Sequence, residues 1–222
     1  MQKFDTPTPI SVDLDIPAGR VRFIAAGRAD ATVEVRPANA SKGRDVKAAE
    51  QTEVAYGDGV LRIKSPAAKN QYFGPSGSIE VTVQLPAGSQ VTARSSCAEF
   101  RGVGQFGDVA FEGAQGVIKI DEAASVRVAA SGGDVSIGRL SGPAEISTGH
   151  GDITIDEALH GAVVLRTQMG DVSVRAAAGA SASLDAGTGY GRIHNALKNT
   201  DGAADLNIHA TTGYGNIDAR SL

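Results

Sequence analysis

The chain has 222 residues, and its 25 acidic and 21 basic side chains give a formal net charge of −4. The charges are interspersed, with no run of Lys and Arg, which argues against nucleic acid as a partner. With 28 glycines, no tryptophan and 5% aromatic residues, the chain has many turns and few bulky core residues, and its single cysteine, Cys97, cannot form an internal disulfide.

The N-terminal residues, Met1 to Ile16, lack the basic and apolar regions of a signal peptide. Apolar runs along the chain stay shorter than the roughly 18 residues that a membrane-spanning helix needs. We therefore expect a cytoplasmic protein without direct membrane insertion.

Apolar and polar residues alternate over 10–16 and again over 21–23, on either side of Pro17-Ala18-Gly19. This pattern predicts a strand, a turn and a second strand. A further strand is expected over 32–36, ended by Pro37.

One short helix is predicted over 45–52, with Asp45 as its N-cap. A β-hairpin comes next over 54–63, turning at its Gly-Asp-Gly. Residues 65–77 have a loop composition, and we expect Tyr72 and Phe73 to form a lid over the first of the regular coils.

From Ile79 onward, one phrase recurs to the end of the chain. A short alternating strand follows a glycine, and a second alternating strand precedes it. A fixed period of about 18–24 residues with two strands per period is typical of a β-solenoid, and parallel strands joined by crossovers predict a right-handed one. The residues in the glycine column are Ala98, Gly116, Gly133, Gly151, Gly170, Gly191 and Gly215.

The predicted fold is therefore all-β. Residues 1–77 form an N-terminal β-rich part and cap, residues 78–222 form the solenoid, and the two make one continuous unit. Because the repeats reach Asp218, we expect the last coil, within 212–222, to leave an open strand edge. That edge either is blunted by charge or docks on another chain, and the longer connection over 195–204 is a candidate partial cap.

Large side chains occupy the position before the glycine in the later repeats. If this position points outward, they form a stripe that can touch a protein partner or a sugar, although stacked aromatics in a solenoid turn can also serve only to stabilise the ladder. The four candidate binding residues are His150, Met169, Tyr190 and Tyr214.

The position after the glycine carries Asp134, Asp152 and Asp171, followed in the sequence of repeats by Arg192. Three carboxylates about 5 Å apart could share a Ca²⁺ ion. The repeats lack the glycine pattern of calcium-binding β-rolls, so we favour aspartates that cap turns, with Arg192 relieving their repulsion. The histidines lack zinc-type spacing, and we expect no metal and no cofactor.

Several phrases resemble the bacterial putative-adhesin family, a domain of unknown function similar to the Toastrack-type domains of envelope-stress proteins. The resemblance covers the chain from about Ile10 to the end and implies a right-handed β-solenoid without established catalysis, linked to adhesion, cell-envelope processes or signalling. The phrases are Leu-Pro-Ala-Gly (85–88), Ser-Gly-Gly-Asp-Val-Ser-Ile (131–137), Thr-Gly-His-Gly-Asp-Ile-Thr-Ile (148–155) and Met-Gly-Asp-Val-Ser-Val (169–174).

Two functions remain open from the sequence. The first is a non-enzymatic interaction or scaffold protein that binds a protein partner or itself, with a glycan as a further option. The alternative is a carbohydrate-active β-helix enzyme, a lyase or hydrolase, that uses Asp134, Asp152 and Asp171 with Arg192 on one outer face.

Overall fold

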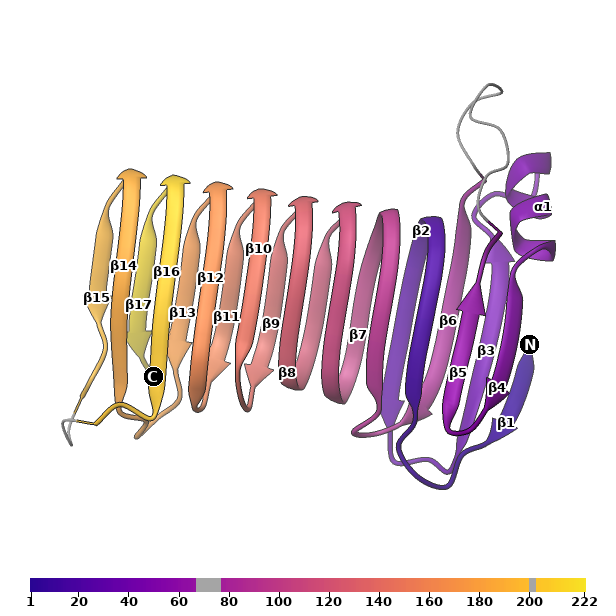
Figure 1. Ribbon diagram of the computed structural model, residues 1–222, viewed down its shortest axis with the longest axis horizontal. Helices are drawn as coiled ribbons and strands as arrows, with labels where there is room; N and C mark the ends of the chain where they lie inside the picture. Colours follow the sequence, from indigo (N-terminus) through magenta and orange to yellow (C-terminus); the bar gives the residue numbers. More distant parts are fainter. Residues whose placement is uncertain (67–76, 200–202) are drawn as a thin grey trace.

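The computed structural model describes residues 1–66, 77–199 and 203–222, and these form a rod of stacked β-coils (Figure 1). Each coil places one strand in each of two layers, and the side chains between the layers form the core. The predicted all-β solenoid with one short helix is confirmed. Three strands, β2 (Ser11–Ala26), β7 (Gln90–Gln115) and β8 (Ile118–Gly132), continue from one layer into the other.

The first layer runs along the rod in the order β4, β5, β2, β7, β8, β10, β12, β16, β14, with β7 passing through two coils. All of its pairings are parallel except that of β4 with β5. Its remaining strands are β4 (Glu53–Gly57), β5 (Val60–Lys64), β10 (Ala144–His150), β12 (Gly161–Met169), β14 (Ala182–Tyr190) and β16 (Leu206–Tyr214).

The second layer runs in the order β1, β3, β6, β2, β7, β8, β9, β11, β13, β17, β15. Only β1 with β3 and β3 with β6 pair antiparallel. The strands not yet located are β1 (Gln2–Asp5), β3 (Asp30–Pro37), β6 (Ile79–Pro86), β9 (Val135–Leu140), β11 (Ile153–Ala158), β13 (Val172–Ala176), β15 (Ile193–Ala196) and β17 (Ile217–Ser221).

The coil made by β16 and β17 is the last in the sequence but not the last in space. β16 pairs with β12 on one side and with β14 on the other, and β17 lies likewise between β13 and β15. In Figure 1 the yellow C-terminal coil lies between two orange ones. The expectation that residues 212–222 form the open end is therefore wrong, because the end coil is β14–β15.

Side-chain polarity gives a physical reason for this order. Asn195 of β15 stands in the register position of Ala219 in β17, and Ala219 in turn lies beside Val174 of β13. Both Ala219 and Val174 are buried, whereas Asn195 is exposed. A coil with an asparagine at an inward position is tolerated at the end of the rod, since burying an unpaired amide inside would cost about 1–3 kcal/mol.

The opposite end of the rod is closed by the antiparallel strands and by helix α1 (Gly43–Glu50) (Figure 1). The helix begins two residues earlier than predicted, after Lys42, and Asp45 is not its N-cap. Oδ1 of Asp45 instead accepts a 3.0 Å hydrogen bond from the backbone N–H of Ser78, which ties the helix to the start of β6. The lid expected from Tyr72 and Phe73 lies outside the described residues.

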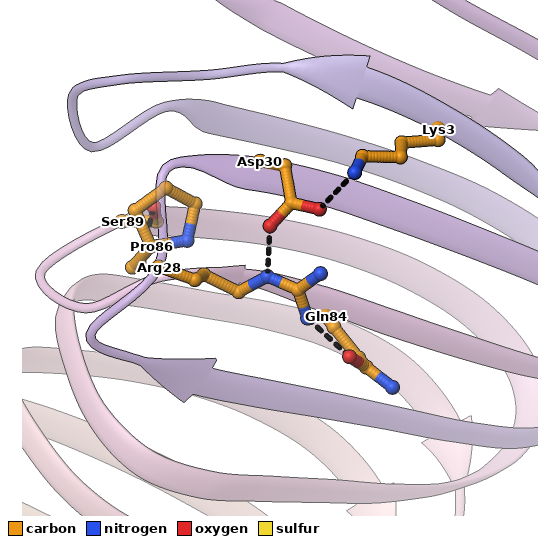
Figure 2. A network of polar contacts seen from close by, with 6 residues as sticks. All are labelled: Lys3, Arg28, Asp30, Gln84, Pro86 and Ser89. Carbon is orange, nitrogen blue, oxygen red and sulfur yellow. Dashed lines mark hydrogen bonds and ion pairs between the residues drawn. The ribbon is translucent and has the colours of Figure 1, made fainter.

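An ion-pair network joins the N-terminal strands (Figure 2). Arg28 Nε lies 2.8 Å from one carboxylate oxygen of Asp30, and Lys3 Nζ lies 3.1 Å from the other. Arg28 also donates to the side-chain carbonyl of Gln84. These contacts, with Arg28 first and Lys3 next, lower the pKa of Asp30 from 3.8 to about 2.

The core changes in character along the rod. Three phenylalanines pack in its N-terminal half, where the ring centroid of Phe100 lies 5.5 Å from that of Phe23 and 5.7 Å from that of Phe111. Beyond them the inward residues are mainly Ile, Val, Leu and Ala, such as Ile153 and Leu165, which are fully buried. Burial of each large aliphatic side chain stabilises the stack by about 1.5–3 kcal/mol.

Candidate functional site

The candidate site is the corner where each coil passes from the first layer to the second. Here the chain turns through the glycine column, and a close approach between coils requires glycine. Gly151 has a φ of +130°, and a Cβ there would overlap the carbonyl oxygen of Gly133 in the preceding coil. The backbones of successive corners therefore stack in direct contact.

A ladder of threonines, of which Thr167 and Thr212 are buried, supports the corner from inside. Thr167 Oγ1 donates a 3.1 Å hydrogen bond to the carbonyl oxygen of Gly151, and Thr212 Oγ1 donates a 2.9 Å bond to that of Gly170. Thr188 repeats this contact with Gly215 at 2.9 Å. These hydroxyls satisfy turn carbonyls that have no partner in the strand ladder, so the corner is rigid.

A second ladder runs along the outside, built from the predicted carboxylate column. The N–H of Asp152 donates to Oδ1 of Asp134 at 3.0 Å, the N–H of Asp171 to Oδ1 of Asp152 at 2.7 Å, and the N–H of Asn216 to Oδ1 of Asp171 at 2.6 Å. The series ends with the N–H of Arg192, which donates to Oδ1 of Asn216 at 3.0 Å. The bonded amides lie in the neighbouring coil.

The structure does not place Arg192 beside Asp171. Asn216 lies between them, because β17 is inserted between β13 and β15. Arg192 therefore does not relieve the charge of the aspartates, and the four residues proposed for a carbohydrate-active site do not form one cluster. Within the residues described, no group of three or more His, Cys, Asp or Glu side chains is arranged to hold a metal ion.

The four candidate binding residues lie in line on the outside of the same corner, and we call them the corner ridge. Parallel registers pair His150 with Met169, Met169 with Tyr214, and Tyr214 with Tyr190. The spatial order along the rod is thus His150, Met169, Tyr214, Tyr190. The ridge contains three of the large exposed hydrophobic side chains, with exposed fractions of 46% for Met169, 58% for Tyr214 and 71% for Tyr190.

The two tyrosines form one aromatic platform. Their ring centroids are 4.9 Å apart and their planes differ by 5°, so the rings are stacked face to face. The ring of Tyr190 covers one face of the ring of Tyr214. Tyr190 itself stands in the end coil, with no further coil of the described structure beside it. A stacked pair loses little conformational freedom on binding, because the two rings already hold each other in place.

The outer surface of the first layer has two open hollows of about 580 and 570 Å³. The smaller one reaches the ridge at His150 and is also lined by Ser147 and Gln168. The side chain of Arg166 lines both hollows, and its Nη1 lies 3.9 Å from Oε1 of Glu145.

Sequence reasoning missed Arg166 and the hollows. The alternation of β12 predicts only that Arg166 lies on the outer surface. The sequence does not distinguish this position from the other solvent-exposed positions of the strand.

The corner ladders and the stacked coils define a two-layered β-solenoid of the repeat type. The chain belongs to the Toastrack family: the family model described as Toastrack DUF4097 matches residues 10–221. This match confirms the resemblance seen in the repeated phrases. No curated protein matches the chain.

Three solved structures are similar in fold. A putative adhesin from Parabacteroides distasonis is 13% identical with a TM-score of 0.49, and one from Bacteroides fragilis is 12% identical with a TM-score of 0.48. In both cases the match covers 98% of this chain and 95% of the other. A putative cell adhesion protein from Clostridium sporogenes is 13% identical with a TM-score of 0.45, covering 100% and 98% of the two chains.

The described residues contain no helix with the length and apolar character that crossing a membrane requires.

Proposed function

We propose that this protein is a non-enzymatic interaction module of the adhesin type, which binds a protein partner through the corner ridge and the adjoining hollow. One observation carries the proposal: the stacked pair of Tyr190 and Tyr214 is exposed to solvent and continues a line of exposed large side chains. Isolated exposed apolar residues are ordinary on a protein surface, but aligned ones favour a binding surface.

The chemistry of the ridge suits a protein surface. Tyrosine, methionine and arginine are the residue types enriched at the centres of interfaces, and all three occur here, with Arg166 at the edge of the hollow. Tyrosine supplies a large flat contact with a polar tip, and methionine adapts to an irregular partner. The stacked rings also suit a sugar ring, so a glycan is the competing ligand.

The bonding of the aspartates favours this function over the carbohydrate-active alternative. One carboxylate oxygen each of Asp134, Asp152 and Asp171 accepts a backbone N–H of the neighbouring coil, as a turn-stabilising residue does. Arg192 is separated from them by Asn216. Catalysis on a glycosidic bond needs a proton donor and a second carboxylate free to face the sugar, and the corner ladder supplies a regular structural series instead.

The test is a double variant, Tyr190→Ala with Tyr214→Ala, compared with Val117→Ala, which truncates an exposed apolar residue elsewhere on the rod. Binding to partners isolated with the wild-type protein and to a glycan array is measured for all three. We expect the double variant to lose most binding at unchanged β-sheet circular dichroism, while Val117→Ala binds like the wild type.

The chain has no tryptophan and four tyrosines, two of which form the platform. The difference in tyrosine emission between the wild type and the double variant therefore reports ligand contact with the ridge. A change of emission on adding a partner protein supports the proposal, and a response to oligosaccharides alone would favour the glycan. Equal binding by wild type and double variant would contradict the ridge as the site.

A further inference from the structure

The end coil, β14–β15, differs from every other coil of the rod in having a neighbour on one side only. β14 pairs only with β16, and β15 only with β17, within the part of the chain that the structure describes. Figure 1 shows no further coil beyond this one, whereas α1 and the antiparallel strands cover the other end. The start of β14 is already occupied on its open side, because the N–H of Ala182 donates a 3.0 Å hydrogen bond to the carbonyl oxygen of Lys198. The two ends of the rod therefore differ in whether a further strand can pair there.

The end coil is joined to the rod by the parallel pairings of β14 with β16 and of β15 with β17. On the first layer, His209 Nδ1 of β16 lies 3.0 Å from Asp185 Oδ2 of β14. On the second layer, His194 Nδ1 of β15 lies 3.8 Å from Asp218 Oδ2 of β17. One His–Asp pair on each layer thus joins the end coil to its neighbour, and the edge that it presents is already formed.

The backbone of β14 offers unpaired groups on its open side. The N–H of Leu206 in β16 donates to the carbonyl oxygen of Ser181, which directs the groups of every second residue of β14 toward β16. The N–H and C=O groups of Leu184, Ala186 and Thr188 consequently face away from the rod. A row of such groups is a template for pairing with another strand.

Apolar side chains of the end coil are also less buried than their register partners in the next coil. Ile193 is 45% exposed, although Ile217, its register partner in the next coil, is 1% exposed. Leu184 is only partly buried, whereas its partner Ile208 is 2% exposed. One more coil stacked on β14–β15 would cover both residues. It would also cover Asn195, whose side-chain oxygen already accepts from the N–H of Leu197 and whose amide nitrogen would need an acceptor in that coil.

From Leu184 to Thr188, the β14 edge also lacks the side chains that usually prevent pairing. Natural edge strands carry Lys, Pro or inward charges, and β14 has none of these, its only charged residue being the outward Asp185. Strand β15 has no lysine or proline either, but it has only four residues, so most of the pairing would fall to β14. Such an edge is suited to pairing with a strand of another chain.

We propose that the β14–β15 edge pairs with the same edge of a second copy of this chain, giving an end-to-end dimer. The occupant must offer two strands at the spacing between the two layers, and an identical end coil does so by construction. A two-fold axis perpendicular to the layers sets β14 antiparallel to β14 and β15 antiparallel to β15. The other end of the rod is closed, so the pairing stops at two copies.

The register follows from the open groups of β14. When the axis passes through Ala186, the two copies of Ala186 exchange backbone hydrogen bonds, and Asp185 lies opposite Gly187 of the other copy. A glycine leaves room for the carboxylate, and the two copies of Asp185 do not face each other. Tyr190 of the corner ridge is the last residue of β14, so the dimer brings the ridges of the two copies close to the interface. Ligand binding by the ridge is therefore measured on a monomeric variant as well.

The first test is sedimentation velocity across a hundredfold concentration range on the wild type, Ile193→Lys and Val117→Lys. We expect a wild-type dimer of twice the chain mass. The Ile193→Lys variant places two lysines near each other in the interface and should dissociate about tenfold or more readily. The control adds the same charge to another exposed position and should dimerise normally.

The second test fixes the register by disulfide trapping in a Cys97→Ser background. The variant Ala186→Cys should cross-link on mild oxidation, because directly opposed antiparallel residues have Cα atoms about 5.5 Å apart, within disulfide reach. The variant Ala162→Cys, exposed on β12, should stay monomeric on a denaturing gel.

A wild-type protein that stays monomeric at every concentration overturns the dimer, as do species longer than two copies or a dimer that Ile193→Lys leaves unchanged. A dimer without the cross-link at 186 overturns the β14–β14 pairing. Measuring ligand binding by the Ile193→Lys monomer separates this result from the fate of the corner ridge.

Discussion

The backbone N–H of Asp152 donates a 3.0 Å hydrogen bond to Oδ1 of Asp134, the aspartate at the same position of the preceding coil. Asp171 repeats the contact with Asp152 at 2.7 Å. We predict that Asp152→Ala, which removes the acceptor of the Asp171 N–H, lowers the free energy of unfolding by about 1 kcal/mol. Asp152→Asn keeps a carbonyl oxygen, as Asn216 does toward Arg192, and should cost less than half of that in urea denaturation.

The same pair of variants tests the cation alternative. If the aspartates held Ca²⁺, adding it would raise the melting temperature of the wild type and not that of Asp152→Ala. We expect no Ca²⁺-dependent rise in either protein. A rise confined to the wild type would assign the column to a metal site.

Adjacent glycines provide a matched test of the corner. Gly133 has a φ of +122°, and a Cβ there would overlap the carbonyl oxygen of Gly116, whereas a Cβ at Gly132 would lie 3.6 Å from the nearest atom, the carbonyl oxygen of His150. Gly133→Ala should therefore lower the free energy of unfolding by about 2–4 kcal/mol through strain and overlap. Gly132→Ala should be nearly neutral, and equal losses in thermal or urea unfolding would refute the close stacking of the corners.

The threonine ladder predicts a loss that depends on position. Thr212 is 5% exposed and its hydroxyl satisfies the carbonyl oxygen of Gly170. Thr212→Val leaves that oxygen buried and unpaired, which should cost about 1–2 kcal/mol in the free energy of unfolding. Thr188→Val removes the same contact in the more exposed end coil and should cost less, because water can replace the lost hydroxyl. A larger loss at Thr188 would contradict the assignment of β14–β15 as the end coil.

Acid sensitivity should arise in part from the N-terminal network. Because the pKa of Asp30 is lowered from 3.8 to about 2, the unfolded chain binds a proton at this carboxyl more readily than the folded chain does. The stability that Asp30 contributes is thus present above about pH 4 and is lost as the pH falls toward 2. Urea midpoints measured from pH 5 to pH 2 should fall less steeply for Asp30→Asn than for the wild type, and parallel curves would exclude this contribution.

Much of the local structure was accessible from the pattern of residues. Alternation placed the strand of Ile79–Pro86 and the hairpin of β4 and β5, because a half-buried strand needs a period of two. The N-cap at Asp45 was a wrong prediction for a tertiary reason. Its carboxylate bonds the amide of Ser78, which is distant in sequence and invisible to any helix-capping rule.

The sequence predicted which residues form the corner ridge, but it did not predict the hollow beside them. The column before the glycine identified His150, Met169, Tyr190 and Tyr214, since equal positions in a repeat share one side of the rod. The hollow beside His150 and the place of Arg166 in it arise from how neighbouring strands twist and pack. No spacing in the sequence encodes that shape.

The sequence by itself determined the coil, meaning which residues of each repeat turn inward, where glycine must stand and where the chain turns, because these depend on local alternation and backbone freedom. Only the tertiary structure decided the order in which the coils stack. Parallel ladders accept any coil of matching length, and the connection after β15 is long enough for β16–β17 to insert beneath β14–β15. Burial then favours Ala219 in the interior over Asn195, and the open edge falls on β14–β15.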